Sequence, residues 1–356
     1  MNPRPYSSCH LGFEFICSMV PETAKKQEYE LPDYISFKSV LIQASSAFEQ
    51  LDKEFHKAYT AYEFLHTHKV DKGFLTYLDS TYGLEDMTGL PKECLFNGNV
   101  GAYTSICMEG LGTVLINIVK RIIEFFKKLY ETIMRFLGVK TFRQRKIEGD
   151  LNTIKRKVEA MSDGEFHSVI KQNVKCNVMT MRISELDKLI DDVQTIYHLL
   201  NSHKDVDNLQ SLISATSGML SKIGHRTENE YKIINDTGLP YQVFEANQTL
   251  NIESSFGIKD KATIFSRIDA INRILDSVTD IKRWYPANLQ KYATRATSVK
   301  IDPNDPESVK LHEASIKKLN EEQKCQAYLC KFIVIYLELV DLLCARAVAT
   351  LGSVSR

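Results

Sequence analysis

The segment 110–138 constrains the fold of this chain most strongly, because a helix built from it must bury one whole face. At about 100° per residue, its large apolar side chains fall on one side of the helix and its charged side chains on the other. The predicted apolar face consists of Leu111, Leu115, Ile118, Ile122, Phe126, Leu129, Ile133 and Phe136. Such a face packs against protein or against lipid, and the choice between the two largely decides the function.

The polar side of this segment and the residues that follow it are strongly basic. Residues 120–157 contain twelve lysines and arginines against four carboxylates, a net charge of +8 in a chain whose overall formal charge is zero. Any attraction to DNA or to anionic lipid would therefore come from this local segregation of charge. The residues predicted to contact phosphate are Lys120, Arg121, Lys127, Lys128, Arg135, Lys140, Arg143, Arg145 and Lys146.

A simpler interpretation stays open for both features. The segment 110–138 would then be an ordinary bundle helix that packs on the helices predicted at 33–70 and 326–350. The basic residues would be a solvated helix surface. The sequence does not decide between DNA, lipid and protein as the partner.

The chain as a whole is predicted to be all-α, a multi-helix bundle with long helices, a central amphipathic helix and a long C-terminal helix. Only 16 glycines and 9 prolines interrupt 356 residues, which fits long unbroken helices. Helical periodicity covers residues 33–70, 142–160 and 259–296, with an interruption expected at Pro286, and a last helix runs from Asp305 to Ala349. Residues 71–106 are expected to form short helices and loops, and residues 237–259 a loop with a short β-hairpin.

These elements suggest three regions along the chain. They are an N-terminal helical region (1–109), the cationic amphipathic helix (110–138) and a C-terminal helical bundle (139–356). The most apolar stretch, 326–351, contains four charged residues, so a single membrane-spanning anchor is not predicted.

No catalytic chemistry is evident in the sequence. Motifs for nucleotide cradles, zinc sites and nucleophile elbows are missing, so we predict no enzyme activity, no cofactor, and no catalytic or metal-binding residues. The eight cysteines lack any paired spacing and are expected to be reduced and buried.

One family resemblance comes from the residues around this helix. The string Ser105 to Gly112 (SICMEGLG), the long Ile/Phe/Lys helix after it and a charged helix from Arg143 together resemble the internal head proteins of large tailed bacteriophages. The resemblance covers roughly residues 100–160. It implies a non-enzymatic virion structural protein, made in the host cytoplasm and packaged in the virion interior with the genome. The implied partners are other virion and capsid proteins, packaged DNA bound without sequence specificity, and a membrane surface.

The same resemblance implies proteolytic maturation. Phage head-maturation proteases commonly cut after glutamate, so the junction of Glu109 and Gly110 is the predicted cleavage point. The sequence places this junction in a loop-like stretch before the helix, and residues 1–109 would then be a removable propeptide. Two other functional classes remain as alternatives: an α-helical membrane-permeabilising or pore-forming protein, and a helical scaffold or adaptor.

Overall fold

The computed structural model describes residues 33–136, 140–204, 208–222, 241–298 and 311–355, and it is dominated by helices, as predicted. The α-helices are α2 (Asp33–Thr67), α3 (Lys72–Tyr82), α4 (Leu84–Thr88), α5 (Lys92–Asn97), α6 (Thr104–Met134), α7 (Phe142–Ala160), α8 (Asp163–Ile170), α9 (Ile183–Ser202), α10 (Leu209–Lys222), α11 (Lys261–Ser298) and α13 (Glu313–Leu351). Short helical turns are η2 (Val100–Tyr103), η3 (Ile252–Phe256) and η4 (Gly352–Ser355). The strands are β1 (Asn173–Lys175), β2 (Thr180–Met181), β3 (Val243–Phe244) and β4 (Thr249–Asn251).

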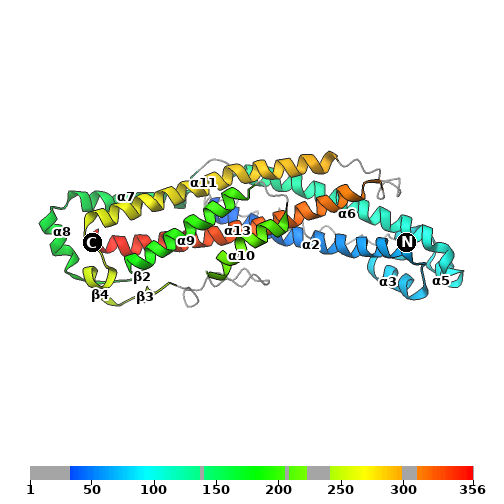
Figure 1. The fold of residues 1–356 in the computed structure, drawn as a ribbon, viewed down its shortest axis with the longest axis horizontal. Coiled ribbons are helices and arrows are strands. Elements are labelled where there is room, and N and C mark those ends of the chain that lie inside the picture. Colours follow the sequence, from blue (N-terminus) through cyan, green and yellow to red (C-terminus); the bar gives the residue numbers. More distant parts are fainter. Residues whose placement is uncertain (1–32, 137–139, 205–207, 223–240, 299–310, 356) are drawn as a thin grey trace, which may run out of the picture.

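The described helices form an elongated rod (Figure 1). Helices α11 and α13 run along the long axis, and α2 and α6 form a hairpin beside one half of them. The short helices α3–α5 close that hairpin at one end of the rod. Helices α7 and α9 cover the other half, and the small strands lie at that end near the carboxyl terminus.

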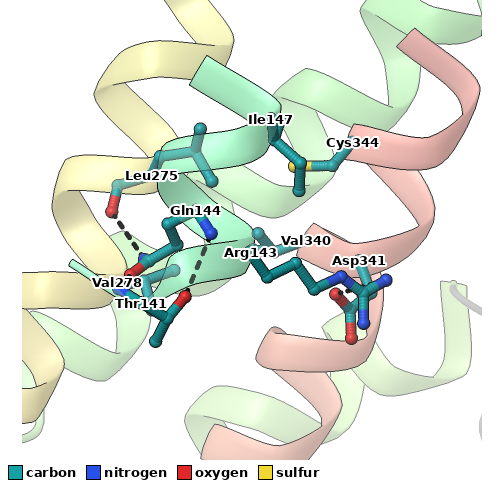
Figure 2. A pocket seen from close by; sticks show the side chains of 9 residues that line it. All are labelled: Thr141, Arg143, Gln144, Ile147, Leu275, Val278, Val340, Asp341 and Cys344. Atoms are coloured by element: carbon teal, nitrogen blue, oxygen red, sulfur yellow. Dashed lines mark hydrogen bonds and ion pairs between the residues drawn. The ribbon is translucent and has the colours of Figure 1, made fainter. Parts of the chain in front are cut away.

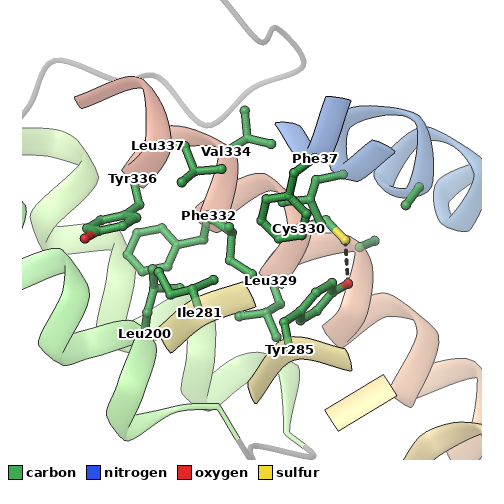
Figure 3. Packing of buried hydrophobic residues seen from close by; sticks show 14 of the residues in the cluster. Phe37, Leu200, Ile281, Tyr285, Leu329, Cys330, Phe332, Val334, Tyr336 and Leu337 are labelled. Atoms are coloured by element: carbon green, nitrogen blue, oxygen red, sulfur yellow. Dashed lines mark hydrogen bonds between the residues drawn. The ribbon is translucent and has the colours of Figure 1, made fainter. Parts of the chain in front are cut away.

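A seven-residue repeat of buried positions explains the rod. Each of three long helices contains a series of buried residues whose spacing alternates between four and three, the repeat that lets helices wrap around each other over a long distance. Helix α13 also buries residues on its other faces. The repeat comprises Phe37, Leu41, Ala44, Phe48, Leu51, Phe55, Ala58, Tyr62 and Leu65 in α2; Ile264, Ile268, Ile271, Leu275, Val278, Lys282, Tyr285, Leu289 and Tyr292 in α11; and Ile316, Leu319, Gln323, Gln326, Cys330, Ile333, Leu337, Val340, Cys344, Ala347 and Leu351 in α13. Figure 3 shows side chains of the three helices meeting in the core, where the hydroxyl of Tyr285 on α11 and the thiol of Cys330 on α13 are hydrogen-bonded.

Several predicted boundaries are confirmed. The charged helix α7 spans residues 142–160 as expected, and 71–106 does form short helices joined by turns. The predicted start of the last helix at Asp305 lies outside the described residues.

Two local predictions are wrong. Helix α11 continues through Pro286 instead of breaking there, because buried neighbours on both sides, Tyr285 and Leu289, hold the helix in the core despite the lost backbone hydrogen bond. The expected hairpin in 237–259 is not formed by β3 and β4 pairing with each other. Instead β4 pairs antiparallel with β1, and β3 with β2, so each strand pairs with a partner some 60–80 residues earlier in the chain.

The amphipathic helix belongs to the common core. It begins at Thr104, earlier than the predicted Gly110, and packs mainly between α2 and α11. Buried residues from Phe37 to Val354 form one continuous cluster, so within the described residues the three predicted regions share a core. None of the helices described here is apolar over a length sufficient to cross a bilayer.

Candidate functional site

The apolar face of α6 is almost wholly used inside the bundle. Seven of its eight predicted members are at most 5% exposed: Leu111, Leu115, Ile118, Ile122, Phe126, Leu129 and Ile133. The eighth, Phe136, follows the helix, is half-buried and lies 5.9 Å from the ring of Phe37.

Aromatic contacts fix α6 against its two neighbours. Phe48 of α2 meets Phe125 edge-on at 4.7 Å and Phe126 at 5.2 Å, and Phe126 stacks on Tyr292 of α11 at 6.1 Å. The prediction that α6 packs on the helix at 33–70 is therefore confirmed. The second main neighbour is α11, where the sequence had suggested 326–350.

The outer face of α6 remains cationic and exposed. Lys120, Lys127, Lys128 and Arg135 all lie on the surface of the bundle. Glu124 and Glu131 are exposed on the same side, so these four cations and two carboxylates give a net charge of +2. Arg121 differs from these cations, because its guanidinium contacts the carboxylate of Glu54 on α2 at 2.6 Å.

The basic run before α7 has a structural use. The ammonium of Lys140 lies 2.8 Å from Glu148 and 2.9 Å from Asp276 of α11, and these two hydrogen bonds raise the pKa of Lys140. The guanidinium of Arg143 lies 3.3 Å from Asp341 of α13. Lys140 and Arg143 thus tie the start of α7 to the bundle, whereas Arg145 and Lys146 stay exposed.

Carboxylates from elsewhere in the chain neutralise about half of the basic window. Four of its cations pair with acids outside residues 120–157, which reduces the net charge from +8 to +4. The pairs are Arg121–Glu54, Lys140–Asp276, Arg143–Asp341 and Lys155–Asp269. Sequence reasoning missed these acids, although the negative balance of the remaining chain was the available signal.

A small cavity lies where α7 meets α11 and α13 (Figure 2). Its volume of about 10 Å³ leaves room for roughly one water molecule. The first turn of α7 is already capped there: Thr141 Oγ1 accepts from the Gln144 amide at 3.0 Å, and Gln144 Oε1 accepts from the Thr141 amide at 2.9 Å. Gln144 Nε2 donates to the carbonyl of Leu275 at 3.3 Å. The cavity is therefore too small and too fully bonded to hold a phosphate or a cofactor.

The cavity also offers no reactive thiol. Burial raises the pKa of Cys344 to about 12, so its thiol stays protonated near neutral pH.

The predicted cleavage junction is folded. Glu109 and Gly110 lie in the second turn of α6, so the expectation of a loop-like stretch there is wrong. Gly110 is buried against α4, and a Cβ at this position would lie 2.6 Å from both the side chain and the carbonyl oxygen of Met87. Proteases prefer exposed loop tips, so this junction is protected while α6 is folded. Cleavage there would also separate α2 covalently from the helices on which it packs.

Neither chemistry nor comparison points to a known activity. Among the described residues, no group of His, Cys, Asp and Glu side chains is arranged to hold a metal ion. No protein-family model, curated protein or solved structure matches the chain. The interpretation of the cationic face therefore rests on this chain alone.

Proposed function

We propose that this chain is a non-enzymatic structural protein of a tailed-phage virion, packaged inside the head beside the genome. The observation that carries the proposal is the two-sided use of α6: its apolar face is buried in the bundle and its cationic face is exposed. In this conformation the helix offers charge, and not apolar surface, to a partner. Phosphate groups of packaged DNA are a partner that needs charge alone.

The geometry of the exposed cations suits a nucleic-acid backbone. Lys120, Lys127 and Arg135 extend along one helix over roughly 22 Å, at 1.5 Å per residue. Contacts of this kind carry no base specificity, and their affinity falls as salt is added. If four phosphates are neutralised, the slope of log affinity against log salt is about −3.6.

A membrane surface is less well supported as the partner. An interfacial helix binds lipid through its apolar face, and here α2 and α11 cover that face. Lipid binding would need the bundle to open first.

A charge-reversal variant with a matched control tests the DNA contact. In the test variant Lys120, Lys127 and Arg135 are replaced by Glu. In the control variant the exposed Lys171, Lys259 and Lys318 are replaced by Glu, which changes the net charge by the same amount. Fluorescence anisotropy with a 30-base-pair duplex, measured over a series of salt concentrations, should show weaker binding and a smaller salt slope for the test variant.

Three results would count against the proposal. Equal weakening in both variants would show that net charge, and not this face, attracts DNA. Absence of the protein from purified DNA-filled heads, by mass spectrometry, would remove the virion assignment itself. Leakage of anionic vesicles by the intact protein at micromolar concentration would instead favour the membrane-permeabilising alternative.

A further inference from the structure

The repeat that builds the rod leaves a problem of register. Both α2 and α13 contain a series of buried side chains at a seven-residue period, alongside other buried residues. Two such faces also match after a slip of seven residues, a shift of roughly 10 Å along the axis. Apolar packing alone therefore selects the present alignment of α2 only weakly.

A charged stripe on α13 follows the same period. Lys317, Lys324, Lys331 and Glu338 are each seven residues apart, and all four contact charged residues of the antiparallel helix α2. The distances are 3.4 Å for Lys317–Glu63, 3.5 Å for Lys324–Asp52 and 2.9 Å for Lys38–Glu338. Lys331 pairs with Glu49.

The sign of the charges is inverted at one position of this stripe. In the first three pairs α13 supplies the cation, whereas in the fourth α13 supplies Glu338 and α2 supplies Lys38. A slip of seven residues in one direction brings Lys331 within one turn of Lys38. A slip in the other direction brings Glu338 within one turn of Glu49. Either slip therefore sets like charges against each other at the inverted pair.

Buried amide groups at the interface between α2 and α13 also favour the present register over a slipped one. Asn320 of α13, 5% exposed, donates to the carboxylate of Asp52 on α2 at 3.0 Å and accepts from Gln323 at 2.8 Å. A slip of α2 would separate Asn320 from Asp52 and leave a buried amide without that partner, which is unfavourable.

We propose that the charged stripe and the buried amide layer together form a register lock, which seats α2 in a single position on α13. The position of α2 also determines how α6 is covered, because Phe48 of α2 packs on Phe125 and Phe126 of α6. The lock therefore keeps the apolar face of the amphipathic helix covered. Ion pairs at the surface contribute little to stability, and for Glu338, whose side chain is 8% exposed, the cost of desolvation offsets much of the attraction to Lys38. The role of the stripe is therefore selection between alignments. This inference does not depend on the proposed virion function.

Swapping the inverted pair provides a sharp test. The variant K38E/E338K keeps an attractive pair in the present register, but it makes every cation lie on α13 and every anion on α2. The stripe then fits equally well after a slip of seven residues. The matched control K317E/E63K also swaps one native pair, yet it leaves the pattern of signs mixed, so it should keep one register.

Spin labels on the exposed positions Lys57 of α2 and Ala345 of α13 report the register, because these positions are offset along the rod and a slip of α2 changes the distance between them. The background has Cys9, Cys17 and Cys94 replaced by serine, and the remaining cysteines are buried. Double electron–electron resonance should give one distance in the parent and in the control. In K38E/E338K the slipped population should rise by roughly tenfold or more, the ratio expected for about 1.4 kcal/mol.

A third variant isolates the amide layer. Adding Asn320→Leu to K38E/E338K removes both the pattern of charge signs and the hydrogen bond from Asn320 to Asp52. If a second spin-label distance appears in this triple variant but not in K38E/E338K, the register is held mainly by the buried amides, and the proposal still stands. A single distance in both variants, with circular dichroism showing intact helices, would overturn the proposal. A second distance in the control K317E/E63K as well would also overturn it, because the pattern of signs would then be irrelevant.

Discussion

Gly110 allows a direct test of how α6 begins. In the interior of an exposed helix, Gly→Ala stabilises a protein by about 1 kcal/mol, because alanine has the higher helix propensity. At Gly110 the added Cβ would lie 2.6 Å from the carbonyl oxygen of Met87, a backbone atom that cannot move aside cheaply. Overpacking of this kind costs about 1–3 kcal/mol, so Gly110→Ala should lower the free energy of unfolding by up to about 2 kcal/mol.

Gly149 supplies the matched control. It lies within α7, is exposed, and has nothing within 4 Å of the place where its Cβ would be. Gly149→Ala should therefore raise the free energy of unfolding by about 1 kcal/mol. Urea denaturation followed by circular dichroism would measure both variants, and the same chemical change should shift the two midpoints in opposite directions.

The result also decides between the folded junction and the loop expected from sequence. If Gly110 preceded the helix in an open loop, the alanine would meet no carbonyl, and its effect would be close to zero. If Gly110→Ala stabilised the protein as Gly149→Ala does, the contact with Met87 would be refuted. The protection inferred for the Glu109–Gly110 bond would then be refuted with it.

Three further outcomes follow from the packing and the charges. Phe126→Ala should lower the free energy of unfolding by about 3–5 kcal/mol, because Phe126 is fully buried between two aromatic rings. In the same urea titration, replacing the exposed Lys127 by alanine should change the free energy of unfolding by no more than about 0.5 kcal/mol. In a background without Cys9 and Cys17, a maleimide at neutral pH should label only the exposed Cys94 in the folded protein and all cysteines in urea, and fast labelling of a second thiol would contradict the buried core. The hydrogen bond from Tyr59 and the nearby ammonium of Lys317 lower the pKa of Glu313, so its contribution to stability should be present above the ordinary glutamate pKa and be lost as the pH falls through the lowered value. The stability difference between the parent and Glu313→Gln should shrink over that acidic range, and a pH-independent difference would contradict the assignment.

Most of the helical architecture could be predicted from local pattern. The apolar face of α6 was identified almost residue by residue, and α7 was placed at its observed ends, because periodicity and capping act over a few residues. The prediction of a break at Pro286 was wrong because it considered only the local cost of a proline in a helix. Packing against helices that are distant in the sequence outweighs that cost. The pairing of β4 with β1 could not be predicted from local pattern either, because the two strands are far apart in the sequence and are brought together only by the fold.

The number of cations available to bind phosphate was overestimated, because the sequence shows the charged residues but not the carboxylates that pair with them in the fold. Lys140 and Arg143 look like members of a basic run, and only the fold brings Asp276 and Asp341 to them. A basic run therefore sets an upper limit on the charge offered to a ligand. The distribution of acids in the remaining chain decides how much of that charge is left.

The period of the long helices is the signal that could have decided the partner of α6. An amphipathic helix needs an apolar surface to cover it, and lipid and protein satisfy that need equally well, so the composition of α6 cannot distinguish them. The distinction lies in the other helices. Helices α2, α11 and α13 each carry a buried, mainly apolar stripe at a seven-residue period, which includes the polar Lys282 in α11 and Gln323 and Gln326 in α13. The lysines of α13 repeat at the same interval. A chain that encodes several matched stripes specifies protein partners for its helices, and the apolar face of α6 is then accounted for inside the bundle before any lipid is considered.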